Sequence, residues 1–183
     1  MRGLRNALPA SACAARSKRI VERLAELEPV AGAHAVALFW PIEERHEVDL
    51  RQLHARLDQR GIRVAYPAID PETRAMTFRF VTDVESMKVQ GFGFREPSFD
   101  APEATSGELD VVIVPALAAD PRGHRIGYGA GYYDRSLPRF APPAASAVVI
   151  FDFQLMAEVP RLEGDVATKW IVTDARVLRA ETS

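Results

Sequence analysis

The sequence has a single cysteine, Cys13, and this scarcity excludes two kinds of site. A disulfide within the chain needs two cysteines, and a zinc site built from cysteines needs several. We therefore expect Cys13 to be a small buried side chain on a helix, in a protein of the reducing cytoplasm. Long apolar runs are absent too. A membrane-spanning helix requires about 20 such residues, so no membrane association is expected.

An excess of positive charge is also missing. The net charge is −2 over 183 residues, and the charged residues are scattered rather than gathered in blocks. Proteins that bind nucleic acid are normally basic, so no nucleic-acid partner is expected. Hydrophobic residues make up 48% of the chain, enough for a complete core, and we predict a single domain over residues 1–183.

Helical and strand-like patterns alternate along the chain. Residues 1–27 are predicted to form two helical pieces separated near Pro9, and residues 49–59 carry leucines at helical spacing. A strand–helix–strand order is typical of a parallel sheet. Residues 76–80 alternate like an antiparallel edge strand with one exposed face, and Pro67 is expected to end the strand before it. Apolar runs predict further strands at residues 35–39, 62–66, 110–115, 147–150 and 170–172.

These patterns predict a fold of the α/β class. We expect one three-layer domain, with a mostly parallel twisted sheet, helices on both of its faces and an antiparallel edge. Ligands of open α/β sheets bind at the carboxyl ends of the strands, so the loops that follow strands are the places to search for a site.

A glycine-rich loop follows the strand at 110–115 and precedes an expected helix near Tyr132. Gly127, Gly129 and Gly131 alternate in it. Glycines let backbone N–H groups turn toward an anion, and a helix N-terminus behind the loop adds partial positive charge. Arg125, expected to be exposed on the loop, could donate to phosphate oxygens. No Gly-Lys-Ser/Thr follows, so this is not a P-loop, and spacing alone also allows a flexible glycine turn.

Residues Arg125 to Arg135 read Arg-Ile-Gly-Tyr-Gly-Ala-Gly-Tyr-Tyr-Asp-Arg. This run resembles the signature of the 5-formyltetrahydrofolate cyclo-ligase (5,10-methenyltetrahydrofolate synthetase) family, and Asp120 and Gly123 match its lead-in. The family often has a lysine where this chain has Met1. Looser likenesses occur along nearly the whole chain, in the order in which the family has them, at Leu4-Arg5, Phe39-Trp40, His46 to Asp49, Gly91 to Pro97 and residues 159–173.

The resemblance implies an ATP-dependent ligase that uses Mg²⁺. It would convert 5-formyltetrahydrofolate and ATP into 5,10-methenyltetrahydrofolate, ADP and phosphate. The formyl oxygen, a poor leaving group, would be phosphorylated to give an iminium phosphate. The nitrogen N10 would then attack the formyl carbon of this intermediate. The partners implied are the folate substrate and ATP, and the protein is expected to be a monomer or a weak homodimer.

The resemblance also implies roles for particular residues. Arg125 and Tyr132 would be catalytic, and Asp134 and Asp165 would hold Mg²⁺ through hard carboxylate oxygens. Whether Tyr132 or Tyr133 faces the ligand stays open. The residues implied for ATP are Arg2, Arg5, Arg125, Ile126, Gly127, Tyr128, Gly129, Ala130, Gly131, Tyr132 and Tyr133. The residues implied for the folate are Phe39, Trp40, Glu47, Gly93, Phe94, Glu96, Gly129 and Tyr132.

Two alternatives remain open at this point. A similar sheet could belong to a sugar-phosphate isomerase or a CoA transferase, which would need a catalytic base or a nucleophilic carboxylate in the loop. The chain could also be a non-catalytic folate- or nucleotide-binding regulator on the same scaffold. Arg125, Asp134 and Asp165 argue against the regulator, because a scaffold that has lost its chemistry has no need of them.

Overall fold

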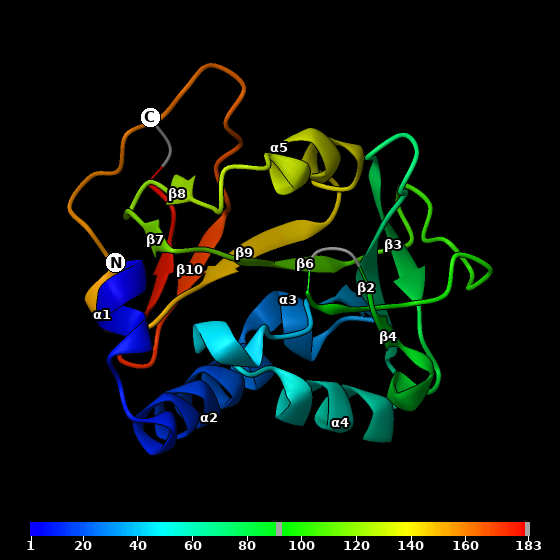
Figure 1. Cartoon of the computed structure of the whole chain (residues 1–183), viewed down its shortest axis with the longest axis horizontal. Helices are drawn as coiled ribbons and strands as arrows, with labels where there is room; N and C mark the ends of the chain where they lie inside the picture. Colours follow the sequence, from blue (N-terminus) through cyan, green and yellow to red (C-terminus); the bar gives the residue numbers. More distant parts are fainter. Residues whose placement is uncertain (91–92, 182–183) are drawn as a thin grey trace.

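The computed structural model describes residues 1–90 and 93–181, and within them seven strands form one sheet in the order β11-β10-β9-β6-β1-β2-β3 (Figure 1). The five strands from β10 to β2 pair in parallel, and β11 and β3 are antiparallel edges. The strands of this sheet are β1 (Ala35–Ala37), β2 (Arg63–Ile69), β3 (Met76–Phe80), β6 (Val111–Pro115), β9 (Ala145–Val149), β10 (Trp170–Val172) and β11 (Val177–Arg179).

Helices cover both faces of the sheet, as predicted. In the view of Figure 1 the larger helices lie below the sheet and α5 lies above it. The helices are α1 (Arg2–Asn6), α2 (Ala10–Glu26), α3 (Glu28–Ala31), α4 (Arg51–Gln59) and α5 (Tyr132–Ser136), with 3₁₀ turns η1 (Glu43–Arg45), η2 (Val84–Ser86), η3 (Leu137–Arg139) and η4 (Asp152–Gln154). None of the helices in the described part of the chain has the length and apolar character needed to cross a membrane.

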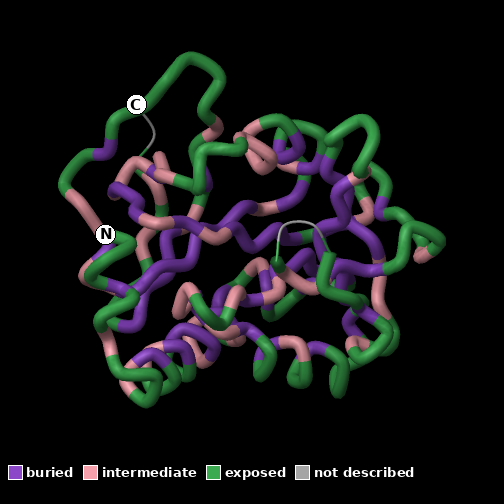
Figure 2. The backbone as a smooth tube through the Cα atoms, in the orientation of Figure 1, coloured by how far each residue is buried: buried purple, intermediate pink, exposed green. Residues whose placement is uncertain are grey.

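The core is divided by the sheet because successive strand residues point to opposite faces. Val36 in β1 packs with Ile20 of α2 and Leu53 of α4 on one side. On the other side Ala37 packs with Leu137 and its neighbours after α5. Strands buried on both faces read as continuous apolar runs, which is why they could be recognised in the sequence, and Figure 2 shows the sheet as the buried centre.

Two details of the β2–β3 edge differ from expectation. Pro67 does not end β2, which continues to Ile69. The Ala65 carbonyl accepts a hydrogen bond from Leu38 on the β1 side, and residue 67 faces the same way, but β1 ends at Ala37. The missing N–H of Pro67 therefore costs no ladder bond, because it faces a region beyond the end of the neighbouring strand.

The expected exposed face of β3 is also wrong, because its first four residues are buried. The segment 101–104 lies along this edge: the Phe80 N–H donates to the Pro102 carbonyl and the Ala104 N–H to the Phe78 carbonyl, both at 2.8 Å. The Arg79 guanidinium donates to the Ala101 carbonyl at 2.7 Å. A covered edge has few unpaired backbone groups, so it offers no template to another strand.

Two short ladders lie outside the sheet. The strands β4 (Lys88–Val89) and β5 (Arg95–Glu96) pair antiparallel, as do β7 (Ala118–Ala119) and β8 (Arg125–Ile126). The second ladder follows β6 directly and ends where the glycine loop begins. It therefore projects that loop from the carboxyl end of a central strand.

Candidate functional site

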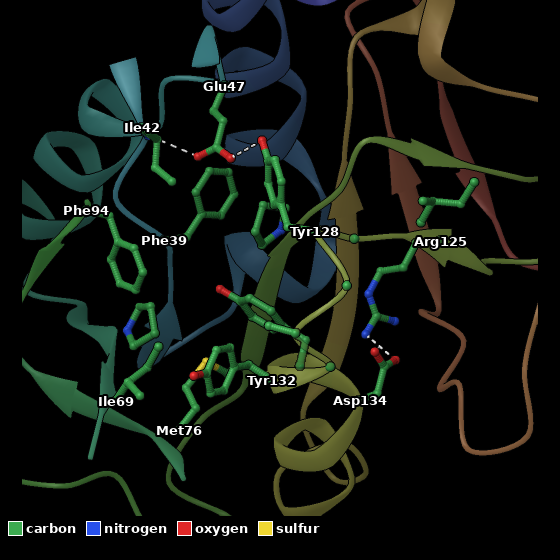
Figure 3. Close-up of a pocket in the computed structure, with 18 of the residues that line it drawn as sticks. Phe39, Ile42, Glu47, Ile69, Met76, Phe94, Arg125, Tyr128, Tyr132 and Asp134 are labelled. Atoms are coloured by element: carbon green, nitrogen blue, oxygen red, sulfur yellow. Dashed lines mark hydrogen bonds and ion pairs between the residues drawn. The ribbon is translucent and has the colours of Figure 1, made fainter. Parts of the chain in front are cut away.

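A pocket of about 740 Å³ lies at the carboxyl ends of β1, β2 and β6 (Figure 3). This is the edge of an open α/β sheet at which ligands generally bind. The lining is Phe39, Trp40, Ile42, Arg45, Glu47, Pro67, Ile69, Met76, Phe94, Pro115, the ten residues from Arg125 to Asp134, Pro160, Leu162 and Asp165.

The pocket has an apolar side and a polar side. Figure 3 shows Phe39, Phe94 and Ile69 on one side, with Arg125 and Asp134 on the other. A site with an extended apolar wall and a few charged groups suits a ligand that carries both a flat ring system and an anionic part.

Two glycines shape the loop on the polar side. Gly129 has φ 87° and Gly131 has φ 63°, a left-handed backbone that favours glycine. Gly131 is the N-cap of α5. A Cβ placed on Gly127 or Gly129 would have no described atom within 4 Å, so the backbone there is open to a ligand. Open glycine backbone beside a cationic group is the arrangement that phosphate binding requires.

The loop is anchored by two residues of its lead-in. The Asp120 carboxylate is fully buried, and it accepts backbone N–H groups from Arg122 at 3.0 Å, His124 at 3.1 Å and Val159 at 3.2 Å. Gly123 has φ 82°, and its carbonyl accepts the Thr168 N–H at 2.9 Å. These contacts tie the β7–β8 ladder to residues 159–168 and so bring the late segment to the pocket.

Arg125 and Asp134 form an ion pair of 2.8 Å at the base of the loop. The Arg125 side chain is only 5% exposed, so the expectation of an exposed loop arginine is wrong. Arg125 also donates to the Val166 carbonyl, and the backbone N–H of Val166 donates to Asp134 at 3.2 Å. Burial lowers the pKa of Arg125, and the Asp134 carboxylate opposes that shift.

The two carboxylates predicted to hold a metal face the same pocket as the glycine backbone. Both hydrogen bonds of Asp134 fall on Oδ1. Asp165 accepts the Leu162 N–H at 2.7 Å, which closes a tight turn. No cluster of three or more acidic, histidine or cysteine side chains that could enclose an ion exists within the described ranges. Mg²⁺ prefers one or two carboxylates with waters and substrate phosphates, so this pair fits it.

A hydrogen-bond chain joins the loop to the segment after β1. The Tyr128 hydroxyl donates to Glu47 at 2.6 Å, and the Glu47 carboxylate also accepts the Ile42 N–H at 2.9 Å. Arg5, a buried residue of α1, donates to the Tyr128 hydroxyl. Burial raises the pKa of Tyr128, and the neighbouring carboxylate acts in the same direction.

Four predicted site residues do not line this pocket, namely Arg2, Arg5, Gly93 and Glu96. Arg2 is exposed on α1, and Arg5 reaches the loop only through Tyr128. Glu96 is buried and accepts the Ile69 N–H at 2.7 Å, so it supports the wall from behind, and burial raises its pKa. Gly93 lines a smaller hollow of about 200 Å³ beside Trp40 and Phe94. Gly91 and Phe92 of the same motif lie outside the described residues.

Tyr132 and Tyr133 both line the pocket, but their surroundings differ. The Tyr133 ring packs 6.4 Å from Phe78, between ring centroids, and its buried hydroxyl has no hydrogen-bond partner among the described residues. Burial raises its pKa. Figure 3 shows Tyr132 between the apolar side and the polar side of the pocket.

Sequence reasoning missed several lining residues. Ile69 and Met76 are register partners across β2 and β3, and they would have been found only if β2 had been extended past Pro67. Arg45 lies in a 3₁₀ turn with no recognisable motif. The others are Ile42, Pro67, Pro115, Pro160 and Leu162.

A mostly parallel sheet with a glycine loop, a buried ion pair and an aromatic wall at its carboxyl edge defines a ligand-binding α/β protein of the open-sheet class. The comparison with known proteins is more specific. The sequence model of the 5-formyltetrahydrofolate cyclo-ligase family matches residues 1–174, and the chain belongs to that family of ligases. The resemblance inferred from the glycine motif is thereby confirmed.

Individual relatives agree with this assignment. The chain is 30% identical over 158 residues to the 5-formyltetrahydrofolate cyclo-ligase of Escherichia coli K12, covering 85% of this chain and 86% of that protein. The enzyme of the same name from Mycolicibacterium smegmatis is 45% identical over 86 residues, which span 46% of this chain and 44% of that protein. The solution structure of Aquifex aeolicus 5,10-methenyltetrahydrofolate synthetase superposes with a TM-score of 0.85 at 26% identity, covering 99% of this chain and 89% of that one.

Proposed function

We propose that this protein converts 5-formyltetrahydrofolate into 5,10-methenyltetrahydrofolate in a reaction coupled to ATP, with release of ADP and phosphate. The observation that carries the proposal is one pocket that combines an aromatic wall with a glycine loop and the Arg125–Asp134 ion pair. Membership of the cyclo-ligase family supports the same reaction and disfavours an isomerase or a CoA transferase.

The chemistry explains why the pocket needs both sides. The γ-phosphoryl group of ATP is transferred to the formyl oxygen, which turns a poor leaving group into phosphate. N10 then attacks the formyl carbon of this iminium phosphate, the C–O bond breaks, and the N10 proton is lost. Such transfers depend on positioning and on neutralisation of charge more than on covalent help from the protein.

The phosphates of ATP fit the polar side. The open backbone at Gly127 and Gly129 provides N–H donors, and Arg125 supplies a guanidinium at the base of the loop. Asp134 and Asp165 would hold Mg²⁺, which neutralises phosphate charge when bound. Tyr132, which lies between the two sides of the pocket, would contact the reacting group.

The folate fits the apolar side. The rings of Phe39, Trp40 and Phe94 offer the flat apolar area that a pterin or benzoyl ring needs. Glu47 lines the same pocket, and a carboxylate can accept hydrogen bonds from pterin N–H groups. The orphaned Tyr133 hydroxyl supports a ligand contact as well, because a buried hydroxyl is rarely left unpaired. Arg2, Gly93 and Glu96 have no direct part in this assignment.

The proposal includes the wider expectations for the protein. We infer a cytoplasmic enzyme, in line with the free, buried Cys13, whose partners are the folate substrate and ATP. We also retain the expectation of a monomer or weak homodimer.

The test is direct. Purified protein is mixed with 5-formyltetrahydrofolate, ATP and Mg²⁺, and the absorbance of the methenyl product is followed. Product is expected only when all three are present. A protein that binds both ligands and forms no product would instead be the non-catalytic regulator. Reactions without ATP, and with a chelator in place of Mg²⁺, are the controls.

A further inference from the structure

Arg45 is a cation of the pocket that has no part in the proposed function. It ends η1 and lines the pocket. Arg125 has its charge balanced by Asp134. No carboxylate in the ranges 1–90 and 93–181 forms an ion pair with Arg45. A cation without an anionic partner on a ligand pocket is suited to receive its counter-charge from the ligand.

The position of Arg45 relates it to the glycine loop. Its guanidinium carbon lies 4.7 Å from the centre of the Tyr128 ring, a cation–π distance, and Tyr128 lies between Gly127 and Gly129. The Arg5 guanidinium lies 5.8 Å from the same ring and donates to its hydroxyl. Two cationic groups therefore meet at one loop residue, where Glu47 is the carboxylate that accepts the tyrosine hydroxyl.

The turn that carries Arg45 is held in place before any ligand arrives. Glu47 accepts the Ile42 N–H at the start of this turn and the Tyr128 hydroxyl from the loop, so it fastens one to the other. The His46 backbone is left-handed, with φ 48°, and its N–H donates to the Glu43 carbonyl at 2.9 Å. A pre-positioned guanidinium loses less freedom on binding, so more of its interaction appears as affinity.

We propose that Arg45 binds the phosphate chain of the nucleotide at the glycine loop. This inference rests on the proposed function, since it assumes that ATP occupies the polar side of the pocket. Phosphate is favoured over a carboxylate of the folate, because Arg45 makes its cation–π contact with a residue of the loop. The planar guanidinium can donate two parallel hydrogen bonds to phosphate oxygens while it keeps its cation–π contact with the Tyr128 ring.

The test measures nucleotide binding without the reaction. Binding of Mg-ADP, in the absence of folate, is measured by calorimetry for the wild type, Arg45→Ala and Arg45→Lys. We expect Arg45→Ala to weaken ADP binding by about tenfold or more, the usual effect of a lost charge-assisted hydrogen bond. Arg45→Lys should fall between, because lysine keeps the charge and loses the fork. Affinity for 5-formyltetrahydrofolate should change by less than about twofold on the same scale.

Arg56→Ala is the matched control, since Arg56 is exposed on α4 and does not line the pocket. It should bind ADP as the wild type does. If Arg45→Ala is poorly folded, Arg45→Gln removes the charge and keeps most of the side chain, and the same comparison applies.

The outcomes separate the two proposals. If the wild type binds Mg-ADP and the Arg45 variants bind it equally well, the inference is overturned while the proposed function stands. Weaker folate binding with unchanged ADP binding would also overturn it, because the anion recognised would then be a folate carboxylate. If the wild type binds no ADP, the proposed function itself fails.

Discussion

The Tyr128 hydroxyl donates a hydrogen bond to the Glu47 carboxylate at 2.6 Å, and this contact joins the glycine loop to the segment that follows β1. The same carboxylate accepts a hydrogen bond from the Ile42 N–H, and the Tyr128 hydroxyl accepts one from the Arg5 guanidinium. The polar side of the pocket therefore does not depend on the loop alone. A change in Tyr128 should therefore alter the position of the turn that carries Arg45.

We expect Tyr128→Phe to lower the free energy of unfolding by about 1.5–3 kcal/mol, because hydrogen bonds to charged groups contribute roughly this much. The ring, and its cation–π contact with Arg45, should remain. Tyr133→Phe is the matched control, since its buried hydroxyl has no partner among the described residues. It should be neutral or stabilising in urea unfolding without ligand. Equal losses for both variants would contradict the role given to the Tyr128 hydroxyl.

Gly123→Ala tests the anchor of the loop. The added Cβ would overlap the Thr168 carbonyl oxygen, and the residue has φ 82°. We expect a loss of more than about 3 kcal/mol, because steric overlap adds to the cost of a left-handed alanine. Gly107→Ala has a similar φ of 89° with no described atom within 4 Å of the new Cβ, so it should lose only about 1–2 kcal/mol. Similar losses in urea unfolding would show that the close approach to Thr168 is unimportant.

Arg125→Ala should impair both stability and ATP use. The side chain is 5% exposed, so its removal leaves Asp134 without its ion-pair partner, and we expect a loss of about 2–3 kcal/mol after allowing for the 31% exposure of Asp134. Arg122→Ala breaks a surface pair with Glu158 and should cost below about 1 kcal/mol. Chemical unfolding measures the stability, and the KM for ATP measures the function. An Arg125→Ala protein as stable as Arg122→Ala would contradict the buried pair.

Much of the fold could be predicted because buried parallel strands leave a continuous apolar signal. The strand at Val111–Pro115 and the helical break at Pro9 were both expected and are present. The edge could not be read in the same way. Whether Pro67 ends a strand depends on where β1 stops, and the burial of β3 depends on residues 101–104, which lie far along the chain.

In the site, too, residues within one motif could be predicted, and contacts between distant segments could not. Arg125 and Asp134 lie in one motif and could be paired with the loop from the sequence, but the burial of Arg125 depends on the distant Val166. No sequence pattern pointed to Arg45. Its contact with Tyr128 exists because Glu47 forms hydrogen bonds with two separate segments of the chain. Local chemistry was therefore predictable, whereas contacts that bring separate loops together were not.

His54 should make stability depend on pH. Burial is the main cause that lowers its pKa, with Asp58 opposing, and its ring accepts or donates a hydrogen bond with the Tyr66 hydroxyl at 3.0 Å. The unfolded chain keeps a pKa near 6.5, so as the pH falls below that value the unfolded state binds a proton before the folded state does. The stability contributed by neutral His54 is complete above about pH 6.5 and is lost as the pH falls through the lower folded pKa.

The comparison is wild type against His54→Gln, unfolded with urea at pH 7.5 and pH 5.5. The wild type should lose more stability on acidification, by at most about 1.4 kcal/mol per pH unit for a single proton. Other histidines contribute equally to both proteins, so the difference isolates His54. An identical loss in the two proteins would show that His54 titrates alike in both states.

The final prediction concerns the metal. Asp134 has two functions in the proposal, because it pairs with Arg125 through Oδ1 and would bind Mg²⁺ from the pocket. Asp134→Asn keeps the shape and an oxygen for Arg125 but removes the charge. We expect the Mg²⁺ concentration for half-maximal activity to rise by about tenfold or more, since a hard cation depends on charged oxygen ligands. Asp165→Asn should act in the same direction, because it lines the same pocket. Asp100→Asn, on an exposed loop residue that does not line the pocket, is the control and should leave the Mg²⁺ requirement as it is. If Asp134→Asn lowers stability and leaves the Mg²⁺ requirement unchanged, the carboxylate serves the ion pair alone, and phosphate charge must be met by the arginines and the loop backbone.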